Sequence, residues 1–415
     1  MRTQVKSSAP LQVATVRDNF RPFGLDGWLL FAAGSLLAVG LVMITSASLD
    51  YAGRRHDSAL FYFYRHAMYM LIGLGAACAC LRVPLQIWNR HAVHLLFASI
   101  LLLVLIFIPG LGYTANNATR WLALGPFTLQ VSEVAKLGVV FYLASYLVRQ
   151  ERLVRSHLLG FVNPMLVMML MVVLLLLQPD FGAVVVMLGA ALGLLFLGGV
   201  RLWQFGILIA ASVIAVAAMV LTEEYRMARF ASFLDPWSYQ QGGGYQLIQS
   251  LIAFGRGEFF GLGLGNSIQK LFFLPEAHTD FIFAVLAEEL GMAGCVAVLA
   301  LFALLIGRLL FIAQRAQAMG EDFGAYVAYG IALIFAIQCF INVGVNIGLL
   351  PTKGLTLPFL SYGGSSLLVC CVSIAIALRV DSEIYLAAVQ RARRRGDNPA
   401  SRKLRPGDSG VHAHG

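Results

Sequence analysis

The chain has 415 residues, of which 59% are hydrophobic and only 12% are charged, and its mean hydropathy is +0.78. These values exclude a water-soluble domain, and the long uninterrupted apolar runs favour spanning helices over a β-barrel. The net charge of +9 lies largely in the two tails and in loops on one side of the membrane. It therefore indicates orientation and anionic headgroups, with no nucleic-acid partner.

About ten apolar segments are long enough to cross a bilayer, which takes about 20 residues each. They lie near 28–47, 66–83, 92–109, 131–148, 160–178, 182–199, 204–221, 281–311, 325–349 and 362–379. The predicted fold class is all-α: a polytopic integral membrane protein with a large extracytoplasmic loop, about 222–280, between helices 7 and 8. The six cysteines lie inside apolar runs, so we expect no disulfide.

We divide the chain into a basic tail (1–22), a transmembrane domain (23–385) and a second basic tail (386–415). An even number of spans places both tails on one side, and their basic residues make that side cytoplasmic. The loops near 110–130, 178–182, 222–280 and 351–364 then lie on the outer face.

The first outer loop carries Arg120 and Trp121. Arginine pairs bidentately with carboxylate or phosphate, so Arg120 is a candidate substrate ligand. The alternative is a headgroup anchor, with Trp121 at the membrane interface. Further on, Glu133 and Lys136 lie on one face of the fourth span, three residues apart. They either line a polar cavity or form a structural ion pair, and both can hold.

Two further outer segments predict local structure. In Gln178-Pro179-Asp180-Phe181-Gly182, proline and glycine indicate a tight link, and Asp180 either caps the next helix or takes part in chemistry. The segment 246–254 places Leu247, Ile248, Leu251 and Ile252 on one helical face, which predicts a short helix in the interface or packed on the bundle.

The start of the eighth span concentrates titratable groups: Glu276, His278 and Asp280. A charge at membrane depth costs about 3 kcal/mol or more unless it is paired or wet, so such groups indicate a site. Asp280 suits a general base or a cation ligand with a raised pKa. The alternative is that Thr279 or Asp280 caps the following helix. Glu288 and Glu289, deeper in the run, must face a partner or water.

The last outer loop contains Lys353 and a stretch rich in glycine and serine, 361–366. Lys353 is placed to meet a pyrophosphate or a carboxylate. The glycines and serines permit non-helical backbone beside a cavity, although Ser365 or Ser366 could instead cap the final span. The sequence shows no HExxH motif and no Cys/His metal cluster, and no Ser-His-Asp arrangement can be read from it.

Several of these segments together resemble the SEDS (shape, elongation, division and sporulation) family. The motifs that carry the resemblance are Ala118-Thr119-Arg120-Trp121, Ser132-Glu133-Val134-Ala135-Lys136-Leu137, Gln178–Gly182, Tyr245–Ser250, Gly263–Ser267 with Gln269-Lys270, Leu274–Phe283 and Leu357–Gly364. They follow the family order over roughly residues 28–380. The run 253–257, with Asn266, Gln269 and Lys270, is more similar to the division branch than to the elongation branch. Glu258 and the three glycines at 242–244 depart from the pattern.

The resemblance implies a ten-helix glycosyltransferase that polymerises lipid II into septal glycan strands in the bacterial cytoplasmic membrane. It implies a class B penicillin-binding protein transpeptidase as partner, together with other division proteins. The family's essential aspartate falls on Asp280. The expected substrate-binding residues are Arg120, Trp121, Glu133, Lys136, Gln269, Lys270, His278, Thr279, Lys353, Ser361 and Tyr362. A divalent cation, Mg or Mn, is expected to share in neutralising the pyrophosphate.

Two other function classes stay open. A lipid II flippase would use Glu133, Lys136 and Glu288 as a polar path, although no obvious inverted repeat with paired broken helices is found. A scaffold that recruits division proteins through its tails predicts that an Asp280→Ala protein keeps its function.

Overall fold

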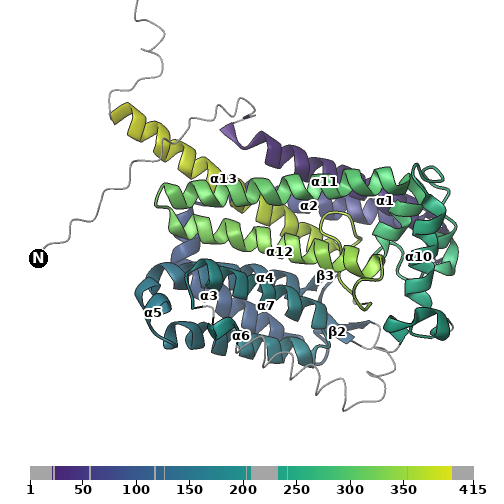
Figure 1. Ribbon diagram of the computed structural model, residues 1–415, viewed down its shortest axis with the longest axis horizontal. Helices are drawn as coiled ribbons and strands as arrows, with labels where there is room; N and C mark the ends of the chain where they lie inside the picture. The colour runs from purple at the N-terminus through teal and green to yellow at the C-terminus, as the bar shows by residue number, and fades with distance from the viewer. Residues whose placement is uncertain are drawn as a thin grey trace, which may run out of the picture.

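The computed structural model describes residues 21, 24–55, 58–115, 118–125, 127–201, 203–206, 232–240, 242–352 and 354–394. Long helices lie side by side along the molecule (Figure 1). A small sheet and the short helix α10 (Tyr245–Gly257) gather at one end, which we call the sheet end, and α5 (Glu151–Ser156) lies at the other. The predicted all-α class is confirmed.

The bundle helices coincide with the predicted spans, apart from the seventh (204–221), which lies almost wholly outside the described residues. Six of the described helices are long and apolar enough to cross a membrane, so the chain is a multi-pass membrane protein. All six cysteines are free, as expected. The bundle consists of α1 (Gly27–Arg55), α2 (Phe61–Arg82), α3 (Leu85–Leu105), α4 (Val131–Arg149), α6 (Leu159–Leu177), α7 (Phe181–Leu197), α11 (Ile282–Ala318), α12 (Asp322–Asn346) and α13 (Gly364–Arg394).

Helix α4 lies at the centre of the bundle. Almost all of its residues are buried, and it packs against α3, α7 and α12. Small residues allow this close approach, as at Gly138, where a Cβ would come within 2.3 Å of Ser99 Oγ. Large apolar side chains of α3 and α6, such as Phe97 and Leu166, point outward instead, as a lipid-facing surface requires. The core therefore positions α4, whose first turn carries Glu133.

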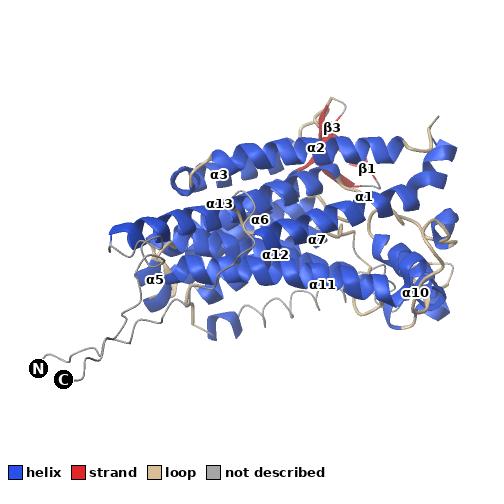
Figure 2. Ribbon diagram, turned by 90° about the horizontal axis from the view of Figure 1, so that it is seen from above, coloured by secondary structure: helices blue, strands red, loops and turns tan. Residues whose placement is uncertain are grey.

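The sequence did not predict the three-stranded antiparallel sheet, which occupies the segment treated as a loop. Its strands β1 (Gly112–Ala115), β2 (Ala118–Leu124) and β3 (Phe127–Gln130) pair in the order β1-β2-β3. Trp121 lies opposite Tyr113 on one side and Gln130 on the other. Strand β3 runs directly into α4, so the sheet lies at the start of the central helix. Figure 2 shows its strands beside α2, toward the end of the molecule that carries α10.

The predicted short helix of the long loop is α10, and it packs on the bundle against α11. Leu247 and Ile248 are buried, and a Cβ on Gly257 would lie 1.9 Å from the carbonyl oxygen of Ala287. Two short turns flank α10, namely η2 (Pro236–Tyr239) and η3 (Gln269–Phe273). The close packing at Gly257 fixes the loop against the start of α11.

The overlong eighth span is a helix of 37 residues with a break at Gly291, where φ is +66°. The loop after α10 fills this break: the amides of Leu262 and Gly263 donate to the carbonyls of Glu288 and Glu289 (both 3.0 Å). In the other direction, the Met292 amide donates to the loop. Backbone groups freed by the break are thus paired, as burial requires.

Candidate active site

A cavity of about 880 Å³ lies at the sheet end, between α2, the sheet, and the segments 276–281 and 352–365. It brings together seven of the predicted site residues, which are Arg120, Trp121, Glu133, His278, Thr279, Asp280 and Tyr362. These residues come from four separate parts of the chain. The fold therefore collects the sequence motifs around one polar space beside the membrane bundle.

Asp280 is held by its backbone, which leaves its carboxylate for the cavity. Its carbonyl oxygen accepts from Asn342 Nδ2 (3.0 Å) and Asn346 Nδ2 (3.1 Å), both on α12. The Asn346 Oδ1 in turn accepts from the Ala284 amide (3.1 Å), which also donates to the Phe281 carbonyl (3.0 Å), and so ties α12 to the start of α11. No side chain of 279–281 caps α11, so the capping interpretation of Thr279 or Asp280 is wrong.

The turn that precedes α11 is built on Glu276, which adopts a left-handed φ of +58°. Its carbonyl accepts from the amides of Thr279 (3.1 Å) and Phe281 (3.2 Å), and its carboxylate accepts from Thr279 Oγ (2.7 Å). A non-glycine residue in this conformation is strained, and such strain concentrates at functional sites. The turn places a second carboxylate, that of Glu276, on the wall that carries Asp280.

The cavity shifts the pKa values of two of its titratable groups, Asp280 and His278. Burial, together with the negative charge of Glu276 and against the opposing charge of Arg120, raises the pKa of the Asp280 carboxyl from 3.8 to about 7. Burial lowers the pKa of His278 below 6.5, with partial opposition from Glu276. The Asp280 carboxylate can thus take up and release a proton near pH 7, while the His278 imidazole is neutral.

Arg120 is oriented by the link between α6 and α7. Its Nε donates to the Gln178 carbonyl (3.3 Å) and its Nη2 to the Pro179 carbonyl (2.6 Å). Its Nη1 lies against Gly354, on the same side as the Asp280 carboxylate. Two of its three nitrogens, Nε and Nη2, are held by carbonyls. The third nitrogen, Nη1, is left to bind whatever occupies the cavity beside Asp280.

The same link is itself fixed in place. Asp180 caps α7 by accepting from the Ala183 amide (3.3 Å), and it also accepts from Ser132 Oγ (2.9 Å). Gln178 Nε2 donates to the Leu103 carbonyl (2.9 Å). The capping interpretation of Asp180 is confirmed, and the motif 178–182 supports the site by holding Arg120.

Glu133 and Lys136 form the predicted ion pair, with 2.7 Å between Oε1 and Nζ. Glu133 lines the cavity, whereas Lys136 is buried behind it. Glu133 therefore both lines the cavity and takes part in a structural ion pair. Lys136 acts on the cavity through the carboxylate that it neutralises.

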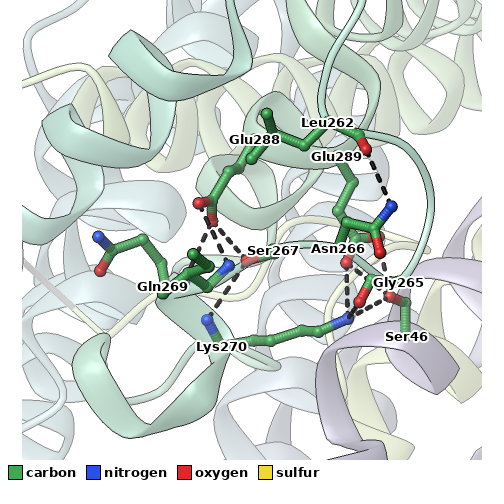
Figure 3. Close-up of polar contacts among 10 residues, drawn as sticks. Ser46, Leu262, Gly265, Asn266, Ser267, Gln269, Lys270, Glu288 and Glu289 are labelled. Atoms are coloured by element: carbon green, nitrogen blue, oxygen red, sulfur yellow. Dashed lines mark hydrogen bonds and ion pairs between the residues drawn. The ribbon is translucent and has the colours of Figure 1, made fainter.

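Gln269 and Lys270 do not line the cavity but belong to a buried polar network between α1, η3 and α11 (Figure 3). Lys270 Nζ contacts Glu289 Oε1 (2.8 Å), Ser46 Oγ (3.0 Å) and the Gly265 carbonyl (2.7 Å). Glu288 pairs with Arg256 (3.3 Å) and accepts from the Gln269 amide (3.2 Å). The expectation that Glu288 and Glu289 face partners is confirmed.

The last outer loop contributes unequally. The Tyr362 ring lines the cavity, with its centroid 5.1 Å from that of Tyr62 and 5.9 Å from that of His278. Ser361 is buried, and its Oγ accepts from the Leu357 amide (2.7 Å), so it shapes the loop. Ser365 likewise joins the start of α13 to β3, through the Gln130 amide and the Thr128 carbonyl (both 2.9 Å). Lys353 lies outside the described residues.

Sequence reasoning missed the contribution of α2 to the cavity, namely Tyr62, Arg65 and Tyr69. A signal was present, because Arg65 is an ionisable residue at the end of a spanning run, as Asp280 is. The predicted span begins at residue 66, which places Arg65 in the preceding loop. The described residues hold no group of three or more His, Cys, Asp or Glu side chains arranged for a metal.

Comparisons with known proteins give a consistent result. The family model described as a cell cycle protein, FTSW_RODA_SPOVE, matches residues 27–385. The probable peptidoglycan glycosyltransferase FtsW of Pseudomonas fluorescens (strain SBW25) is 50% identical over 363 residues, covering 88% of this chain and 89% of that protein. The protein described in the same words from Coxiella burnetii is 50% identical over 358 residues, covering 86% and 96%.

Two solved structures share the fold. A chain from the work described as "Structural coordination of polymerization and crosslinking by a peptidoglycan synthase complex" has a TM-score of 0.72 at 28% identity, and covers 88% of this chain and 99% of its own. The rod shape determining protein RodA of Thermus thermophilus has a TM-score of 0.63 at 28% identity, with coverage of 87% and 98%.

Proposed function

Because this chain belongs to the FtsW/RodA/SpoVE family of cell cycle proteins, we propose that it is a peptidoglycan glycosyltransferase that polymerises lipid II for septal wall synthesis. One observation carries the chemistry. The Asp280 carboxylate and the Arg120 guanidinium both reach Gly354 in a cavity at the sheet end of a membrane bundle. A base and a phosphate-binding cation thus share one space at the end of the membrane bundle.

In this proposal Asp280 is the general base. It takes the proton from the acceptor sugar hydroxyl as that oxygen attacks the anomeric carbon of the donor. The new glycosidic bond forms while the bond between the anomeric carbon and the pyrophosphate oxygen breaks, and the lipid pyrophosphate leaves. A pKa near 7 suits this role, because a base works best when its pKa is near the operating pH.

Arg120 stabilises the charge that develops on the leaving pyrophosphate. Its Nη1 lies beside the reacting groups, and its other donors are fixed by the carbonyls of Gln178 and Pro179, so little reorganisation is needed. Trp121, His278, Thr279 and Tyr362 line the remaining space and are proposed to contact the sugars. Glu133 also lines this wall, where it pairs with Lys136.

A divalent cation remains part of the proposal, as Mg or Mn. The Glu276 carboxylate lines the cavity on the same wall as Asp280 and would supply an oxygen ligand, and the substrate pyrophosphate would supply others. Such an ion, when bound, neutralises charge on the leaving group. A requirement for the metal is tested by chelation and re-addition in the polymerisation assay.

We further propose a class B penicillin-binding protein transpeptidase as partner, with other division proteins at the septum of the bacterial cytoplasmic membrane. Supporting this, the solved neighbour with the TM-score of 0.72 comes from a peptidoglycan synthase complex that coordinates polymerization and crosslinking. In this proposal the sheet end lies on the extracytoplasmic side of the membrane, where the glycan strands are made.

The test is polymerisation of labelled lipid II by the purified protein in complex with its transpeptidase. Glycan ladders that lengthen with time support the transferase. Lipid II translocation in vesicles without ladders would instead support the flippase. Of the flippase path residues Glu133, Lys136 and Glu288, only Glu133 lines the cavity, and Glu288 is paired in the separate network of Arg256 and Ser267.

A further inference from the structure

Arg65 is a second arginine of the cavity, and it lies on a different wall from Arg120. It is in the second turn of α2, which packs against α1 and α13. Arg120 is in β2, which packs against β1, β3 and α4. The two guanidinium groups therefore enter the cavity from separate parts of the fold.

No carboxylate forms a salt bridge with either cavity arginine among the residues that the structure describes. Elsewhere in the bundle, buried and half-buried cations are paired with carboxylates. Lys136 pairs with Glu133, Lys270 with Glu289, and Arg315 with Asp381. A cation left without a carboxylate beside the membrane, but open to a polar cavity, is placed to receive an anion.

Tyrosines surround Arg65 and add hydroxyl donors. The Tyr69 hydroxyl is the hydrogen-bond partner of Arg65, and the side chains of Tyr62 and Tyr362 lie close enough to interact electrostatically with its guanidinium. Burial raises the pKa of Tyr362, which precedes α13, to about 12, so its hydroxyl keeps its proton at neutral pH. These neighbours bring no carboxylate, so no opposite charge lies beside Arg65, and the Tyr362 hydroxyl can donate to a phosphate oxygen.

The proposed reaction uses two lipid-linked substrates, and their chemistry separates their pyrophosphates. In the donor, the pyrophosphate is attached to the carbon that is attacked, so it must lie next to Asp280. In the acceptor, the pyrophosphate is a whole disaccharide away from the attacking hydroxyl. Arg120 meets the first requirement, since its Nη1 and the Asp280 carboxylate both lie beside Gly354.

We infer that Arg65, with Tyr69 and Tyr362, forms a second anion subsite that binds the pyrophosphate of the acceptor lipid. This assignment rests on the proposed glycosyl transfer and adds to it: the donor pyrophosphate lies at Arg120 and the acceptor pyrophosphate at Arg65. The subsite holds the acceptor while its hydroxyl reaches Asp280. The wall of α2 therefore selects a lipid-linked acceptor over a free sugar.

The test compares Arg65→Gln and Arg65→Lys with wild type, each in complex with the transpeptidase in phosphatidylcholine vesicles. The matched control is Arg54→Gln, an exposed arginine at the same end of α1 that contacts the Phe272 ring outside the cavity. We expect Arg65→Gln to raise the KM for lipid II about tenfold or more with a smaller change in kcat, because a charge-assisted hydrogen bond is lost. Arg65→Lys should fall between, and Arg54→Gln should match wild type.

A binding measurement separates this subsite from the catalytic one. Native mass spectrometry with undecaprenyl pyrophosphate should show two copies on wild type and one on Arg65→Gln. An unchanged KM and two bound copies in Arg65→Gln would overturn the subsite, even though wild type still forms strands. Absence of strands in wild type would instead defeat the proposed function.

The headgroup of a membrane phospholipid could also supply the phosphate that Arg65 binds. A second set of vesicles, which contains phosphatidylglycerol, tests this source. If the KM effect of Arg65→Gln appears only after phosphatidylglycerol is added to the vesicles, the residue binds a phospholipid headgroup, and the subsite assignment is wrong. If Arg65→Gln does not fold, the intermediate KM of Arg65→Lys decides the question, since lysine keeps the charge but loses the two-pronged contact.

Discussion

The Asp280 carboxylate and the Arg120 guanidinium both lie beside Gly354, where the absence of a side chain leaves room for the two groups. A Cβ at this glycine would lie 3.3 Å from Asp280 Oδ2 and 3.9 Å from Arg120 Nη1. The first contact is tighter than ordinary packing, so an added methyl group must displace the carboxylate. The space at Gly354 is therefore part of the site.

We expect Gly354→Ala to reduce the polymerisation rate about tenfold, because small displacements of a reacting group are costly in rate. Stability should change little, since Gly354 is exposed to the cavity. The matched control is Gly255→Ala in α10, where nothing lies within 4 Å of the added methyl. Initial rates of ladder formation check the prediction, and equal rates for the two variants would contradict it.

Activity should depend on pH through Asp280. Below its pKa of about 7 the carboxyl is protonated and cannot act as a base, so kcat/KM should rise with pH through that value and then level off. The negative charge of Glu276 helps to raise this pKa. Glu276→Gln removes the charge but keeps an oxygen acceptor for Thr279 Oγ. The midpoint of the pH profile should therefore move to lower pH.

The control for this shift is Glu258→Gln, which changes an exposed carboxylate that does not line the cavity. Its profile should overlay that of wild type. A midpoint that stays in place in Glu276→Gln would show that the titrating group is not Asp280.

We expect Lys270 to contribute to the stability of the fold and not to substrate binding. It is buried against Glu289, so Lys270→Met leaves an uncompensated buried carboxylate and should lower the free energy of unfolding by about 3–5 kcal/mol. The double variant Lys270→Met/Glu289→Gln removes both charges and should recover most of that loss. Thermal unfolding in detergent measures the stability, and ladder assays measure the rate.

Recovery of both stability and polymerisation in the double variant would assign Lys270 to the fold. Recovered stability with no polymerisation would return Lys270 to the substrate-binding residues that the sequence suggested.

The spans and the position of Asp280 were predictable, because both depend on the local cost of placing polar groups in lipid. The same argument anticipated that Glu288 and Glu289 would be paired. It could not name Arg256 and Lys270 as their partners, since those contacts arise when the loop after α10 enters the break at Gly291.

The sheet and the supports of the site were not predictable from the patterns used. The strands of 112–130 are short and follow an apolar helix, so they looked like a loop. Asn342 and Asn346, which hold the Asp280 carbonyl, lie one helical turn apart in a largely apolar span. Their role depends on α12 packing beside α11, which is a tertiary relationship without a local signal.

The most direct test of the central claim is the rate of lipid II polymerisation by Asp280→Asn, measured beside wild type in the intact complex with the transpeptidase. Asparagine keeps the size of the side chain but cannot accept a proton at neutral pH. The account predicts that glycan ladders disappear while the complex remains folded and still binds undecaprenyl pyrophosphate. Ladders of wild-type length and rate from Asp280→Asn would contradict the assignment of Asp280 as the general base.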